Sequence, residues 1–184
     1  QGYSSAASDV YKRQTYTRFA KSLLATPTTR LCAYATTSRT ATETLMKALA
    51  KFGFAGYVGK VNMDRNCAAG LLETTEETIA QTRLWLEETK DGIGAIYPIL
   101  TPRYFPSCTE SCLEQLGKLA EEYHVPVQSH LSEGLDEIDW VHELAPDLDY
   151  YAQAYDRAGL LGPHTRAVIC LLYTSPSPRD KRQS

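Results

Sequence analysis

A histidine and a glutamate lie three residues apart where a strand is predicted to end. The apolar run Val125 to Val127 leads into the segment Gln128 to Glu133, which reads Gln-Ser-His-Leu-Ser-Glu. Imidazole is a common metal ligand, and a nearby carboxylate could carry protons to and from a metal-bound water. His130 and Glu133 are therefore the first candidates for chemistry. A structural or solvent-exposed histidine is the alternative, because one histidine alone cannot hold a metal.

An arginine and a tyrosine follow the preceding predicted strand. Ala95 to Leu100 is a short apolar run, and after it Arg103 stands between Pro102 and Tyr104. This setting suits a guanidinium fork that is held in place and faces a planar, oxygen-bearing ligand. A salt bridge within the loop is the alternative interpretation of Arg103.

Strands and helices alternate along the chain and must position these side chains. Apolar, β-branched or aromatic runs predict five strands, at residues 28–36, 54–61, 95–100, 125–131 and 166–169. Helical periodicity predicts helices at 40–52, after 74, after 107 and at 136–144. Thr74 with Glu77, and Ser107 with Glu110, have the spacing of capping boxes that start two of these helices. Short apolar strands separated by amphipathic helices predict a parallel sheet that is covered on its faces.

Three polar segments follow these strands and are expected at one edge of the sheet. They are Asn62 to Asp64, Thr101 to Tyr104, and His130 to Glu133. Parallel α/β folds place their sites at the carboxyl ends of the strands. A solvated loop is the alternative for each segment taken singly.

Two topologies fit this alternation. We interpret the chain as α/β, a partial TIM-type (β/α)8 barrel with about five parallel strands alternating with helices, because a complete barrel has eight strands and about 250 residues. An open flavodoxin-like sheet is the competing topology. No glycine-rich phosphate loop follows any predicted strand, which argues against a dinucleotide site.

The two ends of the chain are expected not to be native protein. Asp9 to Gln14 can be encoded by GAT GTG TAT AAG AGA CAG, and the reverse complement of that DNA, in a shifted frame, encodes Cys170 to Ser175. This element resembles the end sequence that a transposase attaches to library fragments. We therefore expect residues 1–14 and 170–184 to be non-native tails around a native segment, residues 15–169. A disordered basic tail rich in serine and proline is the alternative.

Composition excludes several classes of partner. The formal net charge is −3, and the tails hold more basic than acidic residues, so the central segment is the more acidic part and a nucleic-acid partner is not expected. No apolar run of about 18 residues occurs, so no membrane span is expected. The cysteines lack the paired spacing of a zinc finger or a redox motif, which favours idle thiols in the reducing cytoplasm.

Three sequence blocks resemble the guanine deaminases of the amidohydrolase superfamily. They are Tyr57 to Asn66, Pro98 to Tyr104 and Pro126 to Glu133, and they agree in order and spacing. Weaker similarity between them extends the resemblance over essentially all of residues 15–169. It implies a distorted (β/α)8 barrel that binds one zinc ion per subunit and uses a metal-bound hydroxide to convert guanine to xanthine and ammonia.

The resemblance also implies a role for each candidate residue. His130 would be a zinc ligand, and Glu133 would be the catalytic proton shuttle between water and a ring nitrogen. Arg103 would hydrogen-bond the purine and Tyr104 would line or stack on it, while His130 and Glu133 also face the substrate. The family's other zinc ligands would fall outside residues 15–169. This chain by itself is therefore expected to be inactive.

The parent protein is predicted to be a cytoplasmic hydrolase that acts on a small purine, and a homodimer is compatible with this prediction. One alternative is an amidohydrolase acting on another ring, such as an adenosine derivative or a triazine. The other is a noncatalytic flavodoxin-like binding module, in which His130 and Glu133 are ordinary loop residues. The remaining histidines, His124, His142 and His164, are expected to be structural or solvent-facing.

Overall fold

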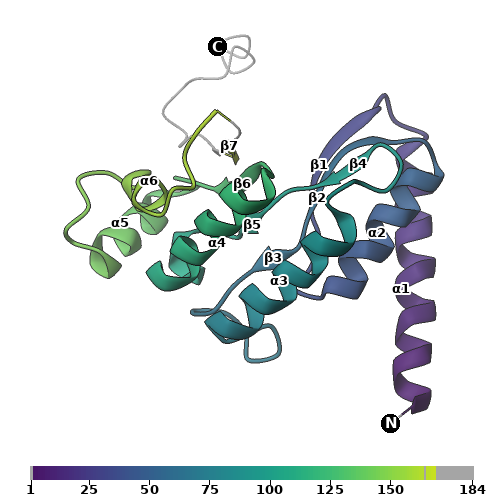
Figure 1. Ribbon diagram of the computed structural model, residues 1–184, viewed down its shortest axis with the longest axis horizontal. Helices are drawn as coiled ribbons and strands as arrows, with labels where there is room; N and C mark the ends of the chain where they lie inside the picture. Colours follow the sequence, from purple (N-terminus) through teal and green to yellow (C-terminus); the bar gives the residue numbers. More distant parts are fainter. Residues whose placement is uncertain (1, 164, 169–184) are drawn as a thin grey trace, which may run out of the picture.

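The computed structural model of the protein describes residues 2–163 and 165–168 of the 184-residue chain. In chain order its elements are α1 (Gly2–Leu23), β1 (Arg30–Tyr34), α2 (Arg39–Lys51), β2 (Ala55–Gly59), β3 (Val61–Asn62), α3 (Thr75–Thr89), β4 (Ile96–Pro98), β5 (Thr101–Pro102), the 3₁₀ turn η1 (Phe105–Ser107), α4 (Glu110–Tyr123), β6 (Val127–His130), α5 (Leu135–Leu144), α6 (Gln153–Arg157) and β7 (Thr165–Val168). Strands and helices thus alternate as predicted (Figure 1). None of the described helices is long and apolar enough to cross a membrane.

The strands pair in parallel and follow one another in chain order. β1 pairs with β2 and β2 with β4, β3 pairs with β5, and β6 pairs with β7. Leu100 joins two of these ladders, since its N–H donates to Pro126 O at 2.9 Å and its carbonyl accepts from Gln128 N–H at 2.8 Å. Sequential order is typical of a barrel, whereas a flavodoxin-like sheet reverses its order at β1. The predicted partial (β/α)8 barrel is confirmed, and the flavodoxin-like alternative is wrong.

The side chain of Gln128 shows how strongly the strands curve. Its Nε2 donates to Thr101 Oγ1 at 2.9 Å and to Ala33 O at 3.2 Å, and its Oε1 accepts from the Cys32 thiol at 2.8 Å. β6 and β1 are three strand positions apart, which is about 14 Å in a flat sheet. Direct contact between them therefore requires the sheet to close toward a barrel, with Gln128 inside it.

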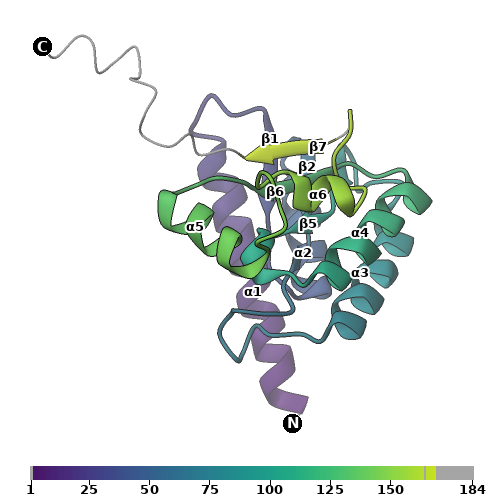
Figure 2. The same cartoon turned by 90° about the vertical axis from the view of Figure 1, so that its left-hand side faces the viewer.

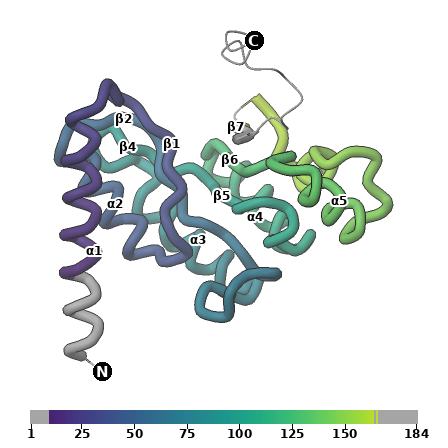
Figure 3. Tube along the Cα trace, turned by 180° about the vertical axis from the view of Figure 1, so that it is seen from behind, coloured from purple at the N-terminus to yellow at the C-terminus, as the bar shows by residue number. Residues whose placement is uncertain are grey.

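Helices cover the outer side of the curved sheet. α2, α3 and α4 lie along the strands, and α1 lies beyond α2 at one end of the molecule (Figures 1 and 3). At the opposite end, α5 and α6 lie near β6 and β7 (Figure 2). The other face of the sheet is the inside of the barrel. Because the strands are parallel, their carboxyl ends lie at the same edge of the sheet.

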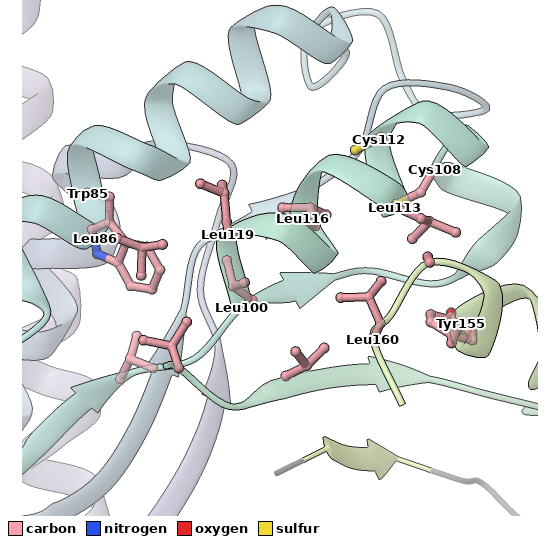
Figure 4. Close-up of a cluster of buried hydrophobic side chains, with 14 of the residues drawn as sticks. Trp85, Leu86, Leu100, Cys108, Cys112, Leu113, Leu116, Leu119, Tyr155 and Leu160 are labelled. Carbon is pink, nitrogen blue, oxygen red and sulfur yellow. The ribbon is translucent and has the colours of Figure 1, made fainter. Parts of the chain in front are cut away.

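The apolar core fills the space between the helices and the strands. Trp85 and Leu86 of α3, Leu116 and Leu119 of α4, and Leu100 from the sheet side belong to one buried cluster (Figure 4). Each of the five side chains is at most 1% exposed. Side chains of this size each contribute about 1.5–3 kcal/mol when buried. This layer therefore fixes α3 and α4 against the strands that carry the polar segments.

Helix α3 confirms one predicted helix start. Its capping box at Thr74 and Glu77 is present. Thr82 and Leu86 are buried on its inner face, while Ile79 is only partly buried. Trp85, described above, is the largest side chain of this face.

The second predicted capping box, Ser107 with Glu110, is wrong. Ser107 lies in η1, and its hydroxyl donates to Tyr104 O at 3.0 Å. Helix α4 is capped instead by Thr109, whose side chain accepts from Cys112 N–H at 3.2 Å. A one-turn 3₁₀ segment between strand and helix shifts the cap by two residues.

Other differences concern boundaries and the ends of the chain. The predicted strand 54–61 is divided into β2 and β3, and the predicted strand 95–100 is represented by β4, with β5 following it. Helix α6 was not predicted. Helix α1 begins within the predicted tail 1–14 and continues past it. His164, Ile169 and the predicted tail 170–184 lie outside the described residues.

Candidate functional site

Two neighbouring strands bring the four predicted site residues together. Arg103 and Tyr104 follow β5, His130 is the last residue of β6, and Glu133 lies in the loop after it. The two strands are in register at this edge, since His130 N–H donates to Arg103 O at 3.1 Å. All four side chains line one cavity of about 300 Å³. The structure therefore confirms that they share one place, while their chemical roles stay predictions.

The imidazole of His130 is held by one hydrogen bond and one ring contact. Its Nδ1 lies 3.3 Å from Arg103 O. A carbonyl oxygen can only accept, so Nδ1 carries the proton and the lone pair is on Nε2. The ring packs against that of Tyr34 from β1, with centroids 4.5 Å apart. His130 is thus oriented in the way that metal-binding histidines usually are, through the nitrogen that does not bind.

Glu133 is exposed and lines the cavity. It follows Ser132, whose φ of 54° lies in the left-handed region. Among the described residues none donates a hydrogen bond to this carboxylate, although the main-chain N–H of Glu133 donates to Glu137 Oε2 at 3.2 Å. Glu133 therefore has a fixed backbone and a side chain that is available to exchange protons.

The guanidinium of Arg103 is supported by uncharged neighbours. It lies over the ring of Tyr104, 5.1 Å from the ring centroid, and Nη1 is 3.6 Å from Met63 Sδ. Among the side chains that the structure describes, residues 10–163 and 165, no carboxylate forms an ion pair with it, so the salt-bridge alternative is not what these residues show. The ring of Tyr104 meets Trp140 edge-on at 6.4 Å. Arg103 can therefore use its N–H donors on a ligand in the cavity.

The third polar segment, Asn62 to Asp64, does not line this cavity. Asn62 is fully buried and points toward α3, where its Nδ2 donates to Thr78 Oγ1 at 3.0 Å and to Thr82 Oγ1 at 2.7 Å. Asp64 accepts from Thr109 N–H at 2.7 Å, which ties the loop to the start of α4. These two side chains stabilise the scaffold. Only Met63, between them, reaches the site by touching Arg103.

A buried lysine lies beside Asn62 and was not singled out from the sequence. The Lys60 side chain is 0% exposed, and its Nζ is 3.0 Å from Glu73 Oε2 and 3.3 Å from Thr78 Oγ1. Burial lowers the pKa of Lys60, and the negative charge of Glu73 opposes that shift. Its partners come from α3 and the preceding loop, so Lys60 belongs to the packing of α3 and lies outside the cavity.

Among the described residues, His130 is the one histidine that lines the cavity. No group of three or more His, Cys, Asp or Glu side chains in that part of the chain could hold a metal ion. His124 is the left-handed C-cap of α4, and His142 is in the last turn of α5; both are exposed, as predicted. A zinc site needs three or four protein ligands. With Nδ1 directed at Arg103 O, Nε2 of His130 is the ring nitrogen that remains free to contact a metal or a ligand.

Comparison with known proteins identifies guanine deaminases among the relatives of this chain. The sequence profile of the amidohydrolase family matches residues 5–183. Guanine deaminase of Dictyostelium discoideum is 36% identical over 163 residues, which are 88% of this chain and 36% of that protein. Guanine deaminase of Escherichia coli is 33% identical over 162 residues, which are 88% of this chain and 37% of that protein. The chain thus spans little more than a third of the length of these relatives.

Solved structures show the same similarity in three dimensions. A crystal structure of guanine deaminase from C. acetobutylicum, with guanine bound in its active site, superimposes with a TM-score of 0.82 at 40% identity. The match covers 88% of this chain and 38% of that one. Atrazine chlorohydrolase from Arthrobacter aurescens, complexed with zinc, superimposes with a TM-score of 0.72 at 13% identity, which shows a shared fold.

Proposed function

The chain belongs to the amidohydrolase family, and from this premise we propose that it is the central part of a guanine deaminase, an enzyme that converts guanine and water to xanthine and ammonia. One observation carries the proposal. The four residues selected from sequence motifs, which lie at the end of β6 and in the segments that follow β5 and β6, line a single cavity. The similarity to guanine deaminases over most of this chain supports the same substrate.

Arg103 and Tyr104 would bind the base. Guanine presents a carbonyl oxygen and a ring nitrogen as adjacent acceptors, and a guanidinium fork can donate to both. The ring of Tyr104 offers an aromatic surface on which a planar purine can stack. Because Arg103 has no described carboxylate partner, its donors are not already committed to the protein. These two residues would therefore select the ring and orient its amino-bearing carbon toward His130 and Glu133.

Glu133 would move the protons of the reaction. Water adds to the amino-bearing carbon, the carbon–nitrogen bond breaks, and the amino group leaves as ammonia. The carboxylate would take a proton from the attacking water and deliver it to the adjacent ring nitrogen, and a second transfer would complete the leaving ammonia. The exposed, unbonded position of Glu133 in the cavity lining suits a group that must be protonated and deprotonated in each cycle.

We propose that His130 binds zinc through Nε2, and that the remaining ligands belong to parts of the parent protein outside this chain. The metal would supply activation of the water nucleophile at neutral pH. Residues 1–14 and 170–184 would be non-native tails, and the parent enzyme would act in the cytoplasm. An intact reading frame that encodes further histidines before residue 15 and after residue 169 is expected. A frame without them contradicts the zinc site.

Arginine replacement in the parent protein tests the substrate. Arg103→Ala should lower kcat/KM for guanine roughly 10- to 100-fold, the value of a charged hydrogen bond. Arg18→Ala, an exposed arginine on α1, is the matched control and should leave turnover unchanged. Equal loss in both variants, or no loss in either, would contradict a guanine site at Arg103. Parallel assays with an adenosine derivative and a triazine test the other rings.

A further inference from the structure

The main chain beside Glu133 is held by a second carboxylate. Glu137 is the third residue of α5, a helix whose N-cap, Gly134, has no side chain to cap it. Glu137 Oε2 accepts from Glu133 N–H at 3.2 Å, and Glu137 Oε1 accepts from Tyr151 Oη–H at 2.5 Å. Both oxygens are therefore used at once, one toward the site loop and the other toward the protein interior.

The tyrosine that holds Glu137 is itself fixed. Tyr151 is 8% exposed, and it stacks on Tyr155 with ring centroids 6.1 Å apart and planes at 24°. Its ring also makes an edge-on contact with the ring of Phe105, with centroids 6.3 Å apart. Burial raises the pKa of Tyr151. The hydroxyl stays protonated at neutral pH and remains a donor to Glu137, in a side chain that cannot move independently of the core.

The neighbouring tyrosine reaches the other half of the site. Tyr155 Oη lies 2.8 Å from Ser129 Oγ and donates to His130 O at 3.2 Å. One stacked pair of tyrosines therefore contacts the main chain of His130 directly and that of Glu133 through Glu137. The two residues would be held at a fixed separation from a common support.

We propose that Glu137 and Tyr151 are positioning residues for Glu133, a role that rests on the proposed function of Glu133 as the proton carrier. Ser132 has left-handed backbone geometry (φ 54°), a conformation that persists only when its surroundings enforce it. The hydrogen bond from Glu133 N–H to Glu137, directly after Ser132 in the chain, helps to hold this backbone conformation. Without it, the loop would sample other conformations and the carboxylate would spend less time facing the cavity.

The restraint can be measured in this chain without turnover. Glu137→Ala should speed amide hydrogen exchange at Glu133 by about tenfold or more, since a hydrogen bond to a charged group is lost. Tyr151→Phe should increase the exchange rate at Glu133 less than Glu137→Ala does. Glu137→Gln keeps one acceptor oxygen, so its exchange rate should lie between those of the wild type and Glu137→Ala. Asp136→Asn and Tyr150→Phe, exposed neighbours of the same types, are the matched controls and should leave exchange at Glu133 unchanged.

Kinetics in the parent protein separate positioning from general stability. Glu137→Ala should lower kcat for guanine about tenfold with KM within about twofold, because Arg103 and Tyr104 still bind the base. Glu137→Gln should recover part of the loss. A fall in thermal stability with kcat and KM both changed would reduce Glu137 to a structural role and overturn the proposal.

The two proposals fail in different ways. Unchanged exchange at Glu133 in Glu137→Ala overturns the positioning role even if the parent enzyme deaminates guanine. Faster exchange at Glu133 in a parent protein that leaves guanine intact means that the restraint exists and the proposed function is wrong, in which case the positioning role in catalysis falls with it.

Discussion

The ring of Tyr34 packs against the ring of His130, with centroids 4.5 Å apart and planes at 51°. Tyr34 is the last residue of β1 and His130 is the last residue of β6. Two residues earlier in each strand, the thiol of Cys32 donates a hydrogen bond to Gln128 Oε1. Side chains two apart in a strand point to the same face. β1 and β6 therefore face each other across the barrel interior through two pairs of side chains, Cys32 with Gln128 and Tyr34 with His130. The candidate metal ligand, His130, is in the pair at the carboxyl ends of the strands.

Two replacements of Tyr34 should distinguish the contribution of its ring to stability from that of its hydroxyl. The Tyr34 hydroxyl is buried and has no hydrogen-bond partner among the described residues. Tyr34→Phe should leave the free energy of unfolding unchanged or raise it by about 1 kcal/mol, because an unsatisfied polar group is removed. Tyr34→Ala should lower it by about 2 kcal/mol through loss of the ring contact. Urea unfolding of both variants checks this, and a costly Tyr34→Phe would show that the hydroxyl has a partner.

Gly59 should not tolerate a side chain. A Cβ atom there would lie 1.7 Å from Thr101 Oγ1 and 2.6 Å from Ile99 O, because the neighbouring strand occupies that space. Gly59→Ala should therefore lower the free energy of unfolding by about 3 kcal/mol or more. Gly70→Ala, where nothing lies within 4 Å, is the control and should change it by no more than about 0.5 kcal/mol. Similar midpoints for the two variants in urea would contradict this packing of β2 against β5.

The sequence predicted the architecture well because its signals are local. Thr74 with Glu77 starts α3 as expected, and the short apolar strands are parallel. What it could not predict depends on contacts between distant segments. Ser107 has the spacing of a helix cap, but it lies in η1 and its hydroxyl donates to Tyr104 O. Lys60 lies near the end of a strand, and nothing in its local sequence indicates that its partner is Glu73, which is 13 residues later.

The candidate site shows the same division. Arg103, Tyr104, His130 and Glu133 were all identified from motifs, and one cavity contains them. The residues that support them were missed, namely Tyr34, Glu137, Tyr151 and Tyr155. These make no motif with the residues they contact, because their contacts join separate elements. The inward alternation of β1 is the one signal that could have indicated Tyr34.

The Lys60–Glu73 pair should be sensitive to which partner is removed. Glu73→Ala leaves a buried ammonium without its carboxylate and should cost about 3–5 kcal/mol near pH 7, whereas Lys60→Met should cost less. Because burial lowers the pKa of Lys60, the folded protein binds fewer protons than the unfolded one, and stability should recover in Glu73→Ala as the pH rises toward 10. Urea unfolding at pH 7 and 10 checks this, with the exposed Glu76→Gln as control. A pH-independent loss would contradict it.

Alkaline pH should destabilise the fold through two buried tyrosines. Burial raises the pKa of Tyr151 and of Tyr155 above the usual value of about 10. Above that value the unfolded chain loses protons that the folded chain keeps, so stability falls with rising pH, by at most about 1.4 kcal/mol per pH unit for each tyrosine. Lys60 opposes this trend until the pH lies about one unit above the ordinary lysine pKa of about 10.4, where lysine is mostly neutral in both states.

Urea unfolding between pH 9 and 12 measures this effect. Tyr155→Phe should make the decline shallower, since one of the two groups is removed, and Tyr150→Phe, which alters an exposed tyrosine, should not. An equal decline in wild type and Tyr155→Phe would show that other groups cause it.

The most direct test of the account is xanthine formation from guanine by the zinc-loaded parent protein and by its Glu133→Gln variant, beside Glu143→Gln as an exposed control on α5. We predict turnover in the parent and in the control. In Glu133→Gln the rate of xanthine formation should fall by at least about 100-fold, the usual contribution of a general acid–base group. The 184-residue chain alone should show no turnover with zinc. A parent that leaves guanine unchanged, or a Glu133→Gln variant as active as the parent, would contradict the account.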